Sequence, residues 1–411
     1  MPHERIARLL ADDLAERARR GSLKGDERVI ADVAPPGDMH GLRYHLAGYG
    51  ERRFLRMNAN NYLGLSLRGD VIAADEHSVR GKGTGPGAVR FISGTWSEHV
   101  ALESAIAAFH GREAAMLFSS AYATMMGVLP CLIGPQTAVI SDALNHNCII
   151  NAMRLGQPQQ RLIYRHLDLD DLERQLVLAA DTCRRAIIVT DGVFSMRGDH
   201  APLARIGALA RRFDDDFAEN VLVIVDDSHG VGAFGDTGRG TEQVSGGEPA
   251  DVLIGTLGKA FGVNGGYVTA APTIIAYLRE NSPFYVYSNP ISPAEAAAAQ
   301  AAIEFVDGPA GKALLDHLRA MTRRLRDGIV AIGLETLPGE HPVVPLVLRD
   351  TPRTRAVVEH LFENDILATG LGYPVVPKGE EEIRFQVCAD HTAADIDQVL
   401  QALANGPALA G

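Results

Sequence analysis

The chain has 411 residues, of which 46% are hydrophobic and 22% charged, so it can bury a large core and form one large domain plus a smaller one. Its net charge of −12 argues against nucleic acid or an anionic membrane surface as the main partner, since both need an exposed basic field. The four cysteines form no CxxC pair, so we predict neither a metal site nor a disulfide framework.

The N-terminal segment predicts a helical arm, which we place at 1–59. Residues 3–20 carry apolar side chains at helical spacing among charges, and a stretch rich in Gly and Pro follows to about Gly50. The start of the chain lacks the apolar core of a secretion signal, and no run reaches the roughly eighteen apolar residues of a membrane span. We therefore expect a cytoplasmic protein that does not enter membranes.

Short apolar strands alternate with helices from 60 to 293. We expect strands at 114–118, 137–141, 185–190, 220–225, 252–255 and 266–270, with helices such as 98–109 and 201–212 between them. Continuously apolar runs separated by helices are typical of parallel strands that are covered on both faces. The pattern predicts a large, doubly wound α/β domain at 60–293.

A different pattern follows Pro293 and predicts a smaller α+β domain at 294–411. Two helices come first, at 294–306 and 311–332. A βαββα pattern then gives a strand at 342–349, a helix at 352–364, strands at 366–369 and 382–387, and a helix at 393–404.

Lys259 is the first candidate catalytic residue. The chain has five lysines and thirty-four arginines, and Lys259 lies among small residues in the run 255–262. An amine forms an imine with an aldehyde, which the guanidinium of arginine cannot do. A lone lysine beside glycines is more often a solvated turn residue. The alternative that the composition favours is a pyridoxal 5′-phosphate (PLP) enzyme, whose other site residues must come from neighbouring strand ends.

Asp226 follows the predicted strand that ends at Val225 and is the second candidate. In open parallel sheets, ligands bind beyond the carboxyl ends of the strands, where both Asp226 and Lys259 are expected. A carboxylate there can pair with the pyridinium nitrogen of PLP and strengthen the ring as an electron sink. An Asp that caps the next turn is the competing interpretation.

Three further strand ends offer groups to the same site. His146 could stack on an aromatic ring, although a structural histidine is the usual alternative. The backbone N–H groups after Phe118 could hold a phosphate, or Ser119 and Ser120 could simply cap a helix. Ser195 could reach the ring substituents.

Several ordered blocks resemble the α-oxoamine synthases, a family of fold-type-I PLP enzymes that condense an amino acid with an acyl thioester. The resemblance covers nearly the whole chain and is strongest toward members that use glycine. The blocks are 60–65, 89–95, 142–146, 191–196, 226–229, 255–260, 373–379 and 383–384.

The resemblance implies a mainly parallel seven-stranded sheet in the large domain, a homodimer with shared active sites, and a role for each matched residue. Substrates would be an amino acid, glycine by this likeness, and an acyl-CoA or acyl-carrier thioester. The implied roles are Lys259 as the PLP-bound lysine and proton acceptor, Asp226 at the ring nitrogen, His229 at the ring hydroxyl, His146 on the ring face, Ser195 near the ring substituents, Ala121, Tyr122, Thr256 and the partner's Ser288 at the phosphate, and Asn60 and Arg384 at the substrate carboxylate.

Two departures concern the substrate side of the site. Pro290 stands where glycine-specific members have Ser, and Arg197 stands where the family commonly has Asp. Another amino acid or acyl donor therefore stays open, as does an aminotransferase, which needs the same lysine and aspartate. A PLP-binding regulatory module would need a DNA-binding segment, which the N-terminal arm does not show.

Overall fold

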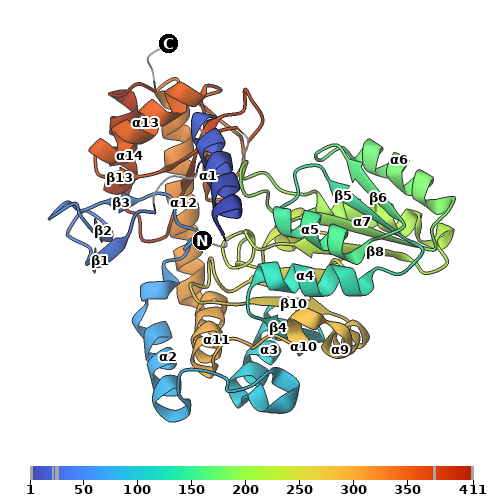
Figure 1. Cartoon of the computed structure of the whole chain (residues 1–411). Helices are drawn as coiled ribbons and strands as arrows, with labels where there is room; N and C mark the ends of the chain where they lie inside the picture. The colour runs from blue at the N-terminus through green and yellow to red at the C-terminus, as the bar shows by residue number, and fades with distance from the viewer. Residues whose placement is uncertain (1–2, 21–22, 24–26, 374–375, 409–411) are drawn as a thin grey trace.

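The computed structural model describes residues 3–20, 23, 27–373 and 376–408. Its large sheet has seven strands in the order β4–β10–β9–β8–β7–β5–β6 (Figure 1). These strands are β4 Ala114–Phe118, β5 Thr137–Asp142, β6 Gln160–Tyr164, β7 Arg185–Asp191, β8 Val221–Asp226, β9 Val252–Thr256 and β10 Gly266–Ala270. The six expected strands are present within a residue or two of their expected bounds.

The mainly parallel seven-stranded sheet that the resemblance implied is confirmed, and two of its details were not predicted from the strand pattern. β10 runs antiparallel to both of its neighbours, because only 257–265 connect it to β9 and such a short connection cannot cross over to a parallel strand. The edge strand β6 was not expected. Its side chains alternate between exposed and partly buried positions, so it lacks the continuous apolar run of the inner strands.

Alternate side chains of the inner strands face two separate hydrophobic layers. Ile187 and Val189 pack on one face with α4 Ala121–Leu132, and Ile188 packs on the other with α7 Leu203–Arg212. The remaining helices of this region are α3 Ser97–Phe109, α5 Asn147–Gly156, α6 Leu169–Ala180, α8 Thr241–Ser245, α9 Pro272–Asn281 and α10 Pro283–Val286. The sheet is thus covered on both faces, as a doubly wound α/β fold requires.

The C-terminal part forms an α+β unit around an antiparallel sheet of order β11–β12–β15–β14. The strands are β11 Glu335–Thr336, β12 Val343–Val347, β14 Thr369–Leu371 and β15 Glu382–Gln386, and the helices are α11 Pro293–Asp307, α12 Pro309–Ala331, α13 Thr351–Glu363 and α14 Ala393–Ala404. The expected strand 366–369 is divided between two sheets: β13 Ile366–Leu367 pairs in parallel with β3 Leu55–Arg56, while β14 joins the antiparallel sheet. Within the block 373–379, Pro374 and Val375 lie outside the described residues.

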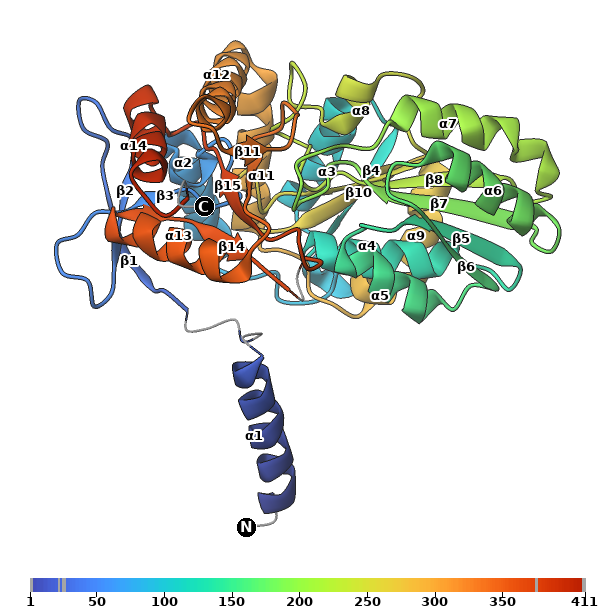
Figure 2. The same cartoon turned by 90° about the horizontal axis from the view of Figure 1, so that it is seen from above.

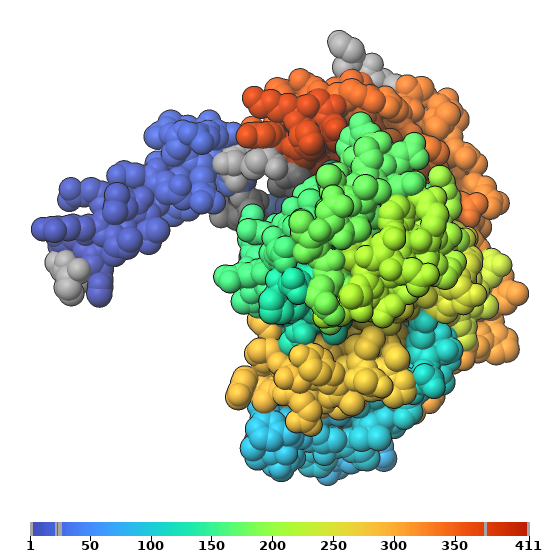
Figure 3. All heavy atoms as spheres, turned by 90° about the vertical axis from the view of Figure 1, so that its right-hand side faces the viewer, coloured from blue at the N-terminus to red at the C-terminus, as the bar shows by residue number. Residues whose placement is uncertain are grey.

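The N-terminal helix α1 Glu4–Arg19 has no buried residue and projects away from the body of the molecule (Figures 2 and 3). The strands β1 Ile30–Ala34 and β2 Arg43–Leu46 pair with each other before β3, and α2 Gly69–Lys82 then packs against α11. Across the described ranges, none of the helices combines the length and the apolar character that crossing a bilayer needs. The domain boundaries at 59 and 293 stay predictions.

Candidate active site

The carboxyl ends of β5, β7, β8 and β9 meet the start of α4 around a cavity of about 270 Å³. Because these four strands are parallel, the residues that follow them gather at one edge of the sheet. The cavity is lined by eight of the eleven predicted site residues, namely Ala121, Tyr122, His146, Ser195, Asp226, His229, Thr256 and Lys259. Asn60, Ser288 and Arg384 do not line it.

Lys259 lies in the short hairpin that joins β9 to β10. Inside this hairpin, Leu257 N donates to Gly265 O and Gly262 N donates to Lys259 O, both at 3.0 Å. A Cβ on Gly262 would lie 2.4 Å from Ser66 N, so this tight turn requires glycine. Burial lowers the pKa of the Lys259 ammonium group, although nearby Asp226 and Asp191 oppose the shift. A larger share of the Lys259 side chain is therefore neutral amine, which is the form that attacks an aldehyde.

Asp226, the last residue of β8, presents its carboxylate to the cavity. Its Oδ1 accepts from Ser228 N at 3.1 Å, and its Oδ2 accepts from the buried Cys148 thiol at 3.3 Å. Burial raises the pKa of Cys148, which keeps the S–H available as a donor. Among the described residues no ion pair to Asp226 is present, so this buried carboxylate is suited to a cationic ligand group such as a pyridinium.

His146 is fixed at the start of α5 by the backbone. Its Nδ1 accepts from Cys148 N at 3.2 Å, and its own N–H donates to Asp191 Oδ2 at 2.9 Å. The first contact leaves the proton of the neutral ring on Nε2. Burial lowers the pKa of His146, so the ring facing the cavity is neutral near pH 7.

His229 is held by Tyr62, a contact that motif spacing did not reveal. Tyr62 Oη lies 2.7 Å from His229 Nδ1, and His341 Nε2 donates to the backbone oxygen of His229 at 2.9 Å. Burial lowers the pKa of His229 well below its usual value. The ring is therefore neutral, and its Nε2 is the nitrogen left for a ligand.

The start of α4 presents backbone donors that suit a phosphate. Ala121 is the first residue of this helix, and the Ser120 hydroxyl accepts only from Ala123 N. The other early N–H groups of a helix have no partner inside it and attract anions. A Cβ on Gly266 would lie 2.3 Å from Ala121 N, so the backbones of β10 and α4 approach closely there. Together with Lys259 and Asp226, this end of the cavity fits the phosphate, the aldehyde and the ring nitrogen of PLP.

Arg384 and Asn60 lie beside the cavity rather than in its wall. Arg384 Nη1 donates to Ser195 O at 3.1 Å, and the Gln386 amide lies 3.0 Å from Asn60 Oδ1. Besides burial, the charge of Arg384 lowers the pKa of both His229 and Lys259. Ser288 follows α10 and is only partly buried, so its predicted phosphate contact across a dimer stays a prediction.

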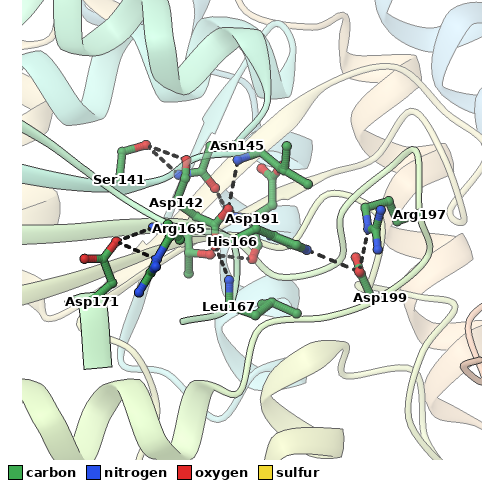
Figure 4. A network of polar contacts seen from close by, with 12 residues as sticks. Ser141, Asp142, Asn145, Arg165, His166, Leu167, Asp171, Asp191, Arg197 and Asp199 are labelled. Carbon is green, nitrogen blue, oxygen red and sulfur yellow. Dashed lines mark hydrogen bonds and ion pairs between the residues drawn. The ribbon is translucent and has the colours of Figure 1, made fainter. Parts of the chain in front are cut away.

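A polar network behind the cavity connects two of its loops (Figure 4). His166 Nδ1 lies 2.9 Å from Asp142 Oδ1, and its Nε2 lies 3.2 Å from Asp199 Oδ2. Burial alone would lower the pKa of His166, but the hydrogen bonds to these carboxylates outweigh it and raise the pKa to about 9. Arg197 Nε also donates to Asp199. A protonated His166 thus joins the loop of His146 to the loop of Ser195.

Comparisons with known proteins show which family this chain resembles. Residues 52–403 match the family described as aminotransferase class I and II. The chain is 38% identical over 403 residues to 2-amino-3-ketobutyrate coenzyme A ligase of Escherichia coli, covering 96% of this chain and 95% of the relative. It is also 38% identical over 353 residues to 8-amino-7-oxononanoate synthase of Petrotoga mobilis, covering 85% and 87%. Serine palmitoyltransferase of S. paucimobilis with a bound PLP–myriocin aldimine has a TM-score of 0.85 at 26% identity, covering 96% of each chain.

Proposed function

The chain belongs to the class I and II aminotransferase family and, within it, to the PLP-dependent α-oxoamine synthases, and from this membership we propose that it condenses glycine with a short-chain acyl-CoA, acetyl-CoA above all. The product would be a 2-amino-3-oxo acid or the aminoketone left after its decarboxylation. The enzyme class, a PLP-dependent C-acyltransferase, is common to the relatives. The choice of glycine and of acetyl-CoA is the proposed part.

One observation carries the assignment of the site: a lysine with a lowered pKa and a carboxylate that makes no ion pair among the described residues share one cavity with two neutral histidines. Lys259 would hold PLP through Nζ, and Asp226 would pair with the ring nitrogen. His229 would contact the ring hydroxyl through Nε2, and His146 would lie on the ring face. When bound, PLP supplies a ring that withdraws electrons from the amino acid Cα.

The remaining groups hold the cofactor and the substrate in place. The N–H groups of Ala121 and Tyr122 and the Thr256 side chain would bind the phosphate, with Ser195 beside the ring. Arg384 and Asn60 would fix the substrate carboxylate, which decides which Cα bond stands perpendicular to the ring. Lys259 Nζ would then take the proton from Cα, because burial favours its neutral form.

The size of the cavity supports glycine as the amino acid. The cavity of about 270 Å³ has to hold PLP as well as the amino acid, which favours an amino acid with a small side chain. The relative named 2-amino-3-ketobutyrate coenzyme A ligase, which matches over 96% of this chain, supports the same choice.

We also propose a homodimer that completes the phosphate site with Ser288 of the second copy. Large apolar side chains are exposed near this residue: Phe91 is 63% exposed, Ile92 64% and Tyr287 81%. Apolar patches of this kind mark interaction surfaces. Sedimentation should give a dimer, and mixing Ser288→Ala protein with Lys259→Ala protein should alter the phosphate contact of only one site in each mixed dimer.

The substrate choice is tested by a panel of amino acids crossed with acyl thioesters and scored by release of free thiol. We expect the highest kcat/KM with glycine and acetyl-CoA. Best turnover with alanine or serine, with a long acyl chain, or with an acyl-carrier thioester would overturn the substrate choice and leave the family intact. Conversion of bound PLP to pyridoxamine phosphate by an amino acid alone would indicate an aminotransferase.

A further inference from the structure

A second cavity of about 350 Å³ adjoins the first and shares Ser195 with it. It lies between the loop after β7 and the β12–β15 part of the small sheet. Its wall is largely apolar, with side chains that include Leu144, Phe194, Met196, Val347, Val376 and Pro377. None of the groups assigned to PLP except Ser195 belongs to this wall, so the cofactor leaves the cavity free for a substrate.

Glu382 is the polar residue that stands out in this wall. It shares one face of β15 with Arg384 and Gln386, since alternate residues of a strand point to the same side. Only 5% of the residue is exposed, and its Oε1 has no hydrogen-bond partner. A buried polar atom without a partner costs stability, unless a ligand supplies the partner.

The charge state of Glu382 follows from its surroundings. Burial raises its pKa to about 8, and the charges of Arg197 and Arg384 oppose this rise only in part. The charged groups around it are Arg197, Asp199, Arg349, Glu380 and Arg384, of which Arg197 is held by Asp199 and Arg349 by Glu335. Near pH 7 the Glu382 carboxyl group is therefore mainly neutral and can donate its O–H.

We propose that this second cavity binds the pantetheine arm of the acyl donor and that the neutral Glu382 carboxyl group donates a hydrogen bond to an amide carbonyl oxygen of that arm. This inference rests on the proposed function, in which the donor is an acyl-CoA. The same arm is carried by acyl carrier proteins, so the contact by itself does not distinguish the two donors.

The size and the polarity of the cavity favour the arm over the acyl group. At about 30 Å³ for each water-sized group, the cavity holds roughly a dozen non-hydrogen atoms, which is about two thirds of the pantetheine arm. An acetyl group would leave most of that volume empty. The pantetheine arm alternates apolar segments with neutral amides, which matches a largely apolar wall in which the two arginines are paired with Asp199 and Glu335 and Glu382 is an uncharged donor.

The test measures binding of CoA and of pantetheine to the PLP-loaded enzyme by calorimetry, between pH 6.5 and pH 9.5. Wild type should lose affinity for both ligands as pH rises through about 8, by roughly tenfold at pH 9, because ionised Glu382 can no longer donate. Glu382→Gln keeps a neutral donor and should bind within about threefold of wild type without that pH dependence. Glu382→Leu should weaken binding about five- to tenfold at pH 7, the value of one hydrogen bond.

Steady-state kinetics give a second readout. The KM for the acyl thioester should follow the same pattern, while the KM for the amino acid stays near that of wild type. If Glu382→Leu does not fold, the proposal is tested by comparing how the ligand affinities of wild type and of Glu382→Gln depend on pH. A Glu382 effect on CoA but not on pantetheine would place the contact at the nucleotide and overturn the proposal.

The test separates failure of this inference from failure of the proposed function. If wild type neither binds CoA nor releases thiol with any CoA thioester, the proposed donor is wrong, and with it this inference. If wild type binds CoA and turns over, but both variants bind it as wild type does at every pH, only the role of Glu382 is wrong. Activity with an acyl-carrier thioester and the same Glu382 dependence would support the contact with the arm and change its source.

Discussion

The carboxyl edge of the large sheet and the face of the small sheet border the same site, yet their polar groups are satisfied differently. On the large-sheet edge, Asn145 Nδ2 donates to Val189 O, Asn145 Oδ1 accepts from Asp191 N, and His166 bridges two carboxylates, although Ser228 Oγ and Asp199 Oδ1 have no partner. On the small-sheet face, Glu382 Oε1 has no partner, and Arg384 Nη1 contacts only a carbonyl oxygen and a thioether.

This difference indicates a division of roles. Groups that are already bonded within the chain keep their geometry before any ligand arrives, which suits the permanent cofactor. Groups with unused donors gain their bonds only when a ligand binds, which suits substrates that enter and leave. Substitutions on the large-sheet edge should therefore affect the cofactor or the fold, and substitutions on the small-sheet face should affect substrate binding.

The largest expected effect is on the large-sheet edge, at Lys259. Lys259→Ala should lower kcat by about 10³-fold or more, because proton transfer at Cα loses its base. The purified variant should also lack the chromophore that borohydride reduces. Lys312→Ala, which changes an exposed helical lysine, is the control and should keep both. A reducible adduct on another lysine of the Lys259→Ala protein would contradict the assignment.

The next effect is on the small-sheet face. Arg384→Lys keeps the charge but loses the planar fork, so we expect the KM for the amino acid to rise about ten- to hundredfold. The absorbance of bound PLP should stay close to that of wild type. Arg324→Lys changes a half-exposed partner of Asp397 and should alter neither. Loss of the cofactor from Arg384→Lys would show that the two regions are not separate in function.

His166 tests whether the large-sheet edge is held together by charge. Its folded pKa of about 9 exceeds the usual 6.5, so its contribution to stability is complete below about pH 6.5 and is lost as pH rises through 9. His166→Gln should lower the free energy of unfolding by roughly 2 kcal/mol at pH 6 and by much less at pH 9.5. Urea denaturation at both pH values measures this, and an equal difference at the two would refute it.

The smallest effect is expected at the junction of the two regions. Tyr62→Phe removes the hydroxyl that lies 2.7 Å from His229 Nδ1. The loss of one hydrogen bond should weaken PLP retention about fivefold, or about 1 kcal/mol. Dialysis against buffer without PLP, followed by absorbance, gives the rate of loss. Tyr122→Phe removes an exposed hydroxyl bonded to Asn147 and Asn151 and serves as a comparison. Unchanged retention in Tyr62→Phe would mean that His229 is positioned without Tyr62.

Local patterns in the sequence predict the strands that are buried on both faces and the residues that follow them. The segment 186–189 is apolar throughout because both of its sides are covered, and Asp226 and Lys259 follow such runs. β6 escaped prediction because an edge strand mixes polar and apolar side chains, and the pairing of β3 with β13 joins segments about 310 residues apart. The partners of His229 and the neutral state of Glu382 depend on burial, which only the folded chain produces.

The hairpin between β9 and β10 has a consequence for redesign of this enzyme. Both of its ends continue into paired strands inside the large sheet, and its turn at Gly262 packs closely against the backbone of Leu65 and Ser66. A loop that is so tightly packed cannot accommodate inserted residues. A lysine moved along it by one position would point its side chain away from the cavity. Engineers who wish to relocate the reactive amine should graft it onto a different strand end instead of sliding it within 257–265.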